Sequence, residues 1–187
     1  MKKGTIILIV IVAIIAILAG SLVSSYNNLV SLEEKVDKAY SNISVQLERR
    51  ADLIPNLVNT VKGYVSHEEE IIKSITEARE NLLKANTVDE KAEANNELSN
   101  AINALMVIVE NYPDLKANEN FINLSDELAG TENRIANSRS EYNDAVATYN
   151  STRKKFPNVL FVGIFGFEEK DYFEVDESKT EVPKVEF

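Results

Sequence analysis

The stretch TIILIVIVAIIAILAGSLV, from Thr5 to Val23, contains no charged residue over nineteen positions. A helix of this length rises about 28 Å, at ~1.5 Å per residue, which matches the hydrocarbon thickness of a bilayer. Such a helix satisfies its backbone hydrogen bonds internally, as lipid requires. We therefore predict a transmembrane helix over residues 5–24, after a short basic N-terminus at residues 1–4, with the lipid bilayer as its partner from Thr5 to Val23.

A cleaved signal peptide is the competing interpretation of this segment. Lys2 and Lys3 resemble its basic start, and Ala19-Gly20-Ser21 offers small residues for cleavage. However, the apolar run exceeds the usual ~7–15 residues of a signal peptide. The helical pattern also resumes at Tyr26 without a break, so we expect an uncleaved anchor.

The basic residues that flank the span predict its orientation. Lys2 and Lys3 precede it, whereas Lys35 and Lys38 follow it among acidic residues. The positive-inside rule counts basic residues near the ends of a span. With the terminal amine added, the balance favours a cytoplasmic N-terminus and places the rest of the chain outside the cytoplasm.

Apolar residues recur at spacings of three and four from Leu29 to Tyr149, which is typical of helices with one apolar face. We predict an all-α fold with four helices at residues 26–51, 53–85, 89–112 and 118–155. Because the loops between them are short, successive helices should be antiparallel neighbours. The sequence thus predicts an up-down-up-down four-helix bundle domain over residues 25–156.

Local signals mark the predicted helix boundaries. Thr87 and Glu90 fit a capping box, Pro113 should end a helix, and Asn118 is suited to begin one. Asp52 with Pro55 fits a helix start, although one long helix kinked at Pro55 would also explain the nearly unbroken apolar pattern. We prefer a hairpin there, because a packed domain requires the chain to reverse.

The last segment, residues 157–187, forms an apolar and then acidic tail. Its apolar run, Val159 to Phe167, is too short to span a bilayer as a helix. We expect it either to pack back on the bundle or to lie in the membrane interface. From Glu174 onward the acidic composition, with Pro183, predicts an extended or disordered end.

Composition excludes several classes of site. A formal net charge of -10 opposes binding to nucleic acid, and the absence of Cys removes thiolate chemistry. The single His67 begins a zincin-like run, but Ile71 stands where the second His is required. No glycine-rich phosphate loop or nucleophile elbow is present. We expect no catalytic residues, metal or cofactor, and a protein that is not an enzyme.

Several blocks of the sequence resemble one known family over nearly the whole chain. They include Tyr26 to Val30, Val45 to Val58, Val61 to Tyr64, His67-Glu68, Tyr112 to Ala117, Thr131 to Ala136, Arg139, Tyr142-Asn143, Tyr149-Asn150, Gly166-Phe167 and Tyr172 to Glu174. The chain resembles the LemA family. The resemblance implies an N-terminal membrane helix and a helical bundle, but no reaction, substrate or site residue.

The predicted topology brings two of these blocks together at one end of the bundle. One hypothesis is a partner-binding tip, formed by Arg49, Arg50, Asp52, Asn56, Tyr112 and Lys116, in which the basic residues offer charge on an acidic body. The alternative is that these residues only cap the helices and hold the two turns. The sequence favours a single-pass protein of a bacterial cell membrane that acts as a non-enzymatic interaction or scaffold module. Its protein partner is not identifiable. The alternatives are an envelope ligand sensor, with a small molecule in the bundle core, and a hydrolase with scattered carboxylates.

Overall fold

The computed structural model describes residues 3–65 and 68–174, and its regular elements are all helical over these ranges. The helices are α1 (Lys3–Lys62), α2 (Glu69–Lys84), α3 (Val88–Val109), α4 (Pro113–Lys116), α5 (Glu119–Lys154) and a 3-10 turn, η1 (Asn158–Leu160). The all-α prediction is confirmed.

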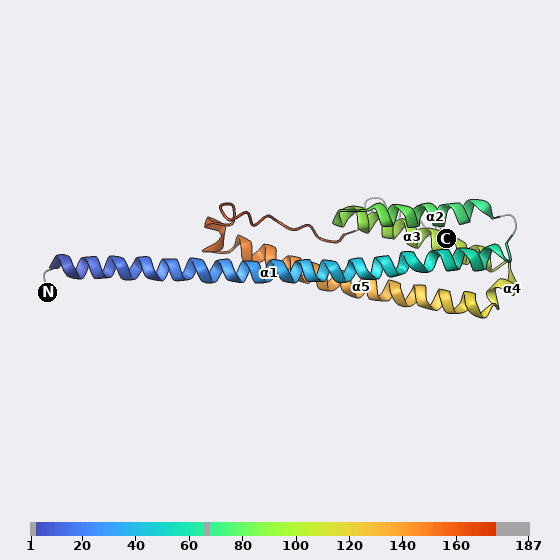
Figure 1. Ribbon diagram of the computed structural model, residues 1–187, viewed down its shortest axis with the longest axis horizontal. Helices are drawn as coiled ribbons and strands as arrows, with labels where there is room; N and C mark the ends of the chain where they lie inside the picture. Colours follow the sequence, from blue (N-terminus) through green and yellow to red (C-terminus); the bar gives the residue numbers. More distant parts are fainter. Residues whose placement is uncertain (1–2, 66–67, 175–187) are drawn as a thin grey trace, which may run out of the picture. The chain divides into compact units, whose positions relative to one another are not determined.

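The chain forms two compact units, and α1 and α5 contribute to both. Unit 1 comprises Met1–Ala39 and Asn143–Lys170, and unit 2 comprises Tyr40–Tyr142 and Asp171–Phe187. In unit 2, the second part of α1, then α2, α3 and the first part of α5 alternate in direction (Figure 1). This is the predicted up-down-up-down arrangement of four helices. Its interior contains buried aliphatic side chains from all four, including Ile43, Leu57, Ile75, Leu98, Leu105 and Ile135.

The predicted hairpin between residues 51 and 53 is wrong, because α1 continues through Pro55 to Lys62. Pro55 has no N–H to offer the carbonyl of Ala51, four residues earlier. That buried carbonyl instead accepts a hydrogen bond of 2.8 Å from Arg79 Nε, on α2. The chain reverses only after α1 ends, at residues 63–68, of which 66 and 67 lie outside the described residues.

The other predicted boundary signals are confirmed. Thr87 and Glu90 form the capping box at the start of α3. Pro113 opens the short α4 after the end of α3. Asn118 Oδ1 accepts from the Phe121 backbone N–H at 3.0 Å, which caps the start of α5.

In unit 1, the tail folds back along the end of α5. Side chains of α5 hold it there by hydrogen bonds to the backbone of the tail. Tyr149 Oη donates to the Glu168 carbonyl at 2.9 Å, and Asn150 exchanges two hydrogen bonds with the backbone of Lys170. Burial, and then the charge of Glu33, raises the pKa of Tyr149, so its phenol remains a donor. Glu33 also pairs with the Lys170 ammonium at 2.8 Å.

The apolar start of α1 is not covered by any described part of the protein. Its most apolar window has a mean hydropathy of 3.3 and is 0% buried. Within the described residues, this is one helix long and apolar enough to cross a membrane. The first side chain of α1 that is fully buried in unit 1 is Leu29. The packed part of the helix therefore begins after the apolar run ends.

Candidate functional site

Arg50, which we predicted at the bundle tip, lies inside the bundle and is only 3% exposed. Its Nη1 donates to Asn95 Oδ1 at 2.6 Å and to Ser99 Oγ at 3.0 Å, and it pairs with the Glu132 carboxylate. Burial lowers the pKa of Arg50, and the charge of Glu132 opposes that shift. The guanidinium group of Arg50 therefore joins α1 to α3 and α5 and is not presented at the surface of the bundle.

The expected meeting of Arg50 with Tyr112 does not occur. Ser99, a partner of Arg50, precedes the end of α3 at Val109 by ten residues, or about 15 Å at the rise of a helix. The reason is the missing hairpin: because α1 continues to Lys62, Arg50 stands more than three turns before the end of that helix.

The remaining predicted tip residues also lie apart from one another. Arg49 pairs with Glu127 of α5 at 3.0 Å, and both side chains are about half exposed. Asp52 and Asn56 are exposed on α1. Lys116, the last residue of α4, pairs with Glu110 at 2.6 Å. Of the six predicted residues, Tyr112 and Lys116 are at the end of the bundle.

That end is held together by side-chain contacts that the sequence analysis did not predict. Asn118 Nδ2 donates to Tyr64 Oη at 2.8 Å, which joins the turn after α1 to the start of α5. Tyr112 Oη donates to Glu68 at 3.3 Å. We call the surface formed by the residues 64, 68, 107, 110, 112, 116, 118 and 122 the α4 end of the bundle.

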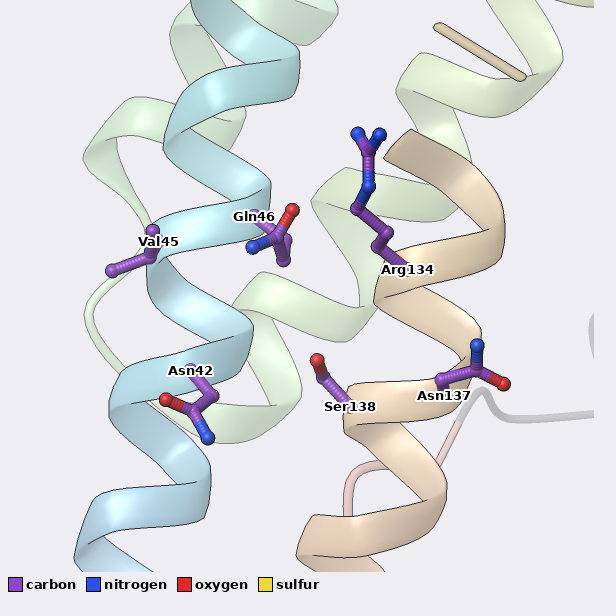
Figure 2. A pocket seen from close by; sticks show the side chains of 6 residues that line it. All are labelled: Asn42, Val45, Gln46, Arg134, Asn137 and Ser138. Carbon is purple, nitrogen blue, oxygen red and sulfur yellow. The ribbon is translucent and has the colours of Figure 1, made fainter. Parts of the chain in front are cut away.

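Two hollows open on unit 2. One, of about 360 Å³, lies between α1 and α5 and is lined mainly by polar side chains (Figure 2). Gln46 Oε1, on its α1 side, is buried without a hydrogen-bond partner in the described structure. The other hollow, of about 400 Å³, is bordered by Arg50, Ser99 and Glu132. Both are open surface hollows, whereas a ligand sensor of the predicted kind would hold its ligand in the core.

Two carboxyl groups, those of Glu90 and Glu169, have shifted pKa values, and both shifts have structural causes. The pKa of Glu90 is lowered by backbone hydrogen bonds at the α3 cap, and that of Glu169 is lowered by Lys154 and Arg153. Among described residues, no group of three or more His, Asp or Glu is placed to hold a metal ion. His67, considered for metal binding in the sequence, lies outside the described residues.

Comparison with known proteins identifies the family. The model of the LemA family matches residues 39–187, which is most of the chain. The chain belongs to the LemA family. The resemblance found in the sequence is therefore confirmed.

Relatives extend this match toward the N-terminus of the LemA-family chain. It is 26% identical to magnetosome protein MamQ 2 of Paramagnetospirillum magneticum over 200 residues, covering 92% of this chain and 74% of the relative. It is 27% identical to magnetosome protein MamQ of Magnetospirillum gryphiswaldense, with the same coverage. It is also 28% identical to protein LemA of Metamycoplasma hominis, over 67% of this chain and 58% of that protein.

Two polar side chains that form hydrogen bonds between helices, those of Arg79 and Asn95, were not predicted from the sequence. Arg79 and Asn95 lie in helical stretches of mixed polarity, where polar residues usually face solvent. The signal that existed for Arg79 was indirect: an interior proline leaves a carbonyl that needs a donor from elsewhere.

Proposed function

We propose that this LemA-family chain is a single-pass protein of a bacterial cell membrane whose helical bundle binds a partner protein and catalyses no reaction. In this proposal residues 5–24 are the anchor, residues 25–156 are the bundle domain, and the bundle lies outside the cytoplasm. The uncovered apolar start of α1 supports the anchor. Two Lys lie on each side of the span, and the terminal amine adds one more positive charge on the N-terminal side, which supports the orientation.

The observation that carries the proposal is the exposure of apolar side chains at the α4 end. Val107, in the last turn of α3, is 72% exposed, Ile122, in the first turn of α5, is 44% exposed, and Tyr64 is 41% exposed. All three residues lie close to helix ends at the α4 end, and exposed apolar side chains are found at protein interfaces. The exposed ion pair between Lys116 and Glu110 lies at the same end and adds polar groups to it.

Features of the bundle argue against the two alternatives. A small-molecule sensor needs a mostly apolar, largely enclosed pocket, but the hollow of Figure 2 is open and polar. An acid catalyst of a hydrolase has a raised pKa, whereas the pKa values of Glu90 and Glu169 are shifted downward, so these two residues do not support that role. These features favour an interaction module.

Photo-crosslinking in living cells tests the proposal. A photoreactive phenylalanine analogue is placed at Val107 or Ile122 of the full chain, in the organism's own membranes. We expect both positions to form the same adduct with one other protein. The exposed residues Val45 and Leu83, which lie elsewhere on the bundle, are the matched controls and should not form it.

A second variant checks that the adduct reflects binding. Val107→Asp should abolish the adduct formed from Ile122, whereas Leu83→Asp should leave it intact, since both changes are at exposed sites. If the control positions form the adduct as efficiently as the α4 end, or if no position forms one, the proposal is overturned.

A further inference from the structure

Five large apolar side chains, one just before the tail and four within it, remain exposed although this segment is folded. Their exposed fractions are 75% for Phe156, 45% for Val159, 63% for Leu160, 81% for Ile164 and 52% for Phe165. They fall within ten residues of sequence. Soluble proteins rarely leave so many neighbouring apolar side chains exposed to water. We therefore expect another molecule or a membrane to cover this surface.

This exposure does not come from a lack of packing. Phe161 and Phe167, in the same segment, are buried, and Phe161 contacts Phe165 at 5.7 Å between ring centroids. Arg153 Nε donates to the Phe167 carbonyl at 2.9 Å, while Lys154 and Arg153 pair with Glu169. The fold thus holds one set of apolar side chains inward and presents the other outward.

The tail meets α1 close to the end of the apolar run. The Tyr26 ring lies 5.2 Å from the Phe165 ring and 5.5 Å from the Phe167 ring, between centroids. Tyr26 follows Val23 by three residues, or about 4.5 Å along the helix. In unit 1, the tail lies at the end of α5 from which the apolar part of α1 projects (Figure 1).

The surface of a membrane is well placed to cover the exposed apolar side chains of residues 156–165. If Thr5 to Val23 spans a bilayer, Tyr26 and Phe165 stand at the level of the lipid headgroups, where aromatic side chains are enriched. Lys155, next to Phe156, is exposed and long enough to reach lipid phosphates while its stem covers apolar surface.

We propose that residues 156–165 form a second membrane contact, inserted in the interface of the bilayer beside the point where α1 leaves it. This inference rests on the proposal that α1 spans the membrane. A two-point attachment would fix the angle at which unit 1 stands on the membrane, which one helix alone does not determine.

Tryptophan fluorescence tests this contact, because the native chain has no Trp. Single-Trp variants of the full protein are made at Ile164, at Ile14 within the span, and at Val107 on α3, all of which are exposed. Each is reconstituted into phosphatidylcholine vesicles whose acyl chains carry bromine either near the headgroup or near the chain end. Bromine quenches only a fluorophore that it contacts.

We expect Ile164→Trp to lose most of its emission to bromine near the headgroup, and less to bromine near the chain end. Ile14→Trp should show the reverse order, and Val107→Trp should resist both. If Ile14→Trp is quenched but Ile164→Trp behaves like Val107→Trp, the second contact is overturned and the anchor stands. If Ile14→Trp is not quenched, the membrane anchor itself fails, and this inference fails with it.

Discussion

Arg49 and Arg50 are adjacent in the chain and have different roles. Arg50 is buried and joins three helices through Asn95, Ser99 and Glu132, whereas Arg49 makes one exposed ion pair with Glu127. One step along a helix rotates the side chain by about 100°, which is enough to move a charge from the interior to solvent. A buried charge of this kind is costly unless all its partners are present.

Arg50→Ala should therefore lower the free energy of unfolding by roughly 3 kcal/mol, because it strands the buried amide of Asn95 and removes the partner of Glu132. The matched change Arg49→Ala should cost less than about 1 kcal/mol, since its ion pair is exposed. Chemical unfolding of the full chain in detergent, followed by circular dichroism, measures both. Equal costs for the two variants would contradict the assigned role of Arg50.

At the scale of the element, α1 is a helix that continues past its own proline. An interior proline costs about 3 kcal/mol, because a backbone hydrogen bond is lost and the ring crowds the preceding turn. Here Arg79 replaces the missing donor by bonding to the carbonyl of Ala51. The helix therefore runs on to Lys62, and the reversal is moved to the residues that follow.

This compensation predicts that Pro55 and Arg79 are energetically coupled. Arg79→Met should cost about 1–3 kcal/mol in the native chain, because the buried Ala51 carbonyl then lacks a donor. In the Pro55→Ala background the helix regains a backbone N–H, so the same change should cost clearly less. A double-mutant cycle from unfolding curves measures the difference. An identical cost in both backgrounds would show that Arg79 acts in some other way.

At the scale of the whole molecule, the proposed orientation can be read by labelling, because the chain has no Cys. Single-Cys variants at Asn100 and Ser151, both exposed, should react with a membrane-impermeant maleimide in intact cells. Lys3→Cys should react only after lysis. These results would place the bundle outside the cytoplasm, as the positive-inside rule predicts.

The reverse pattern, with Lys3→Cys labelled in intact cells and the other two only after lysis, would overturn this orientation. The search for a partner would then turn to proteins of the cytoplasm. In either case Asn100 and Ser151 should behave alike, because one membrane segment precedes both in the proposed topology.

The sequence by itself determined the features that depend on local pattern. The apolar run from Thr5 to Val23, the helical periodicity, the Thr87–Glu90 cap and the all-α fold all follow from neighbouring residues. Tertiary structure decided what depends on a partner far away in the chain. Arg79 carries α1 through Pro55, Asn95 and Glu132 draw Arg50 inward, and Tyr26 receives the tail beside the apolar run. A proline ends a helix only if nothing replaces its missing hydrogen bond, and a charge stays at the surface only if nothing inside can pair with it.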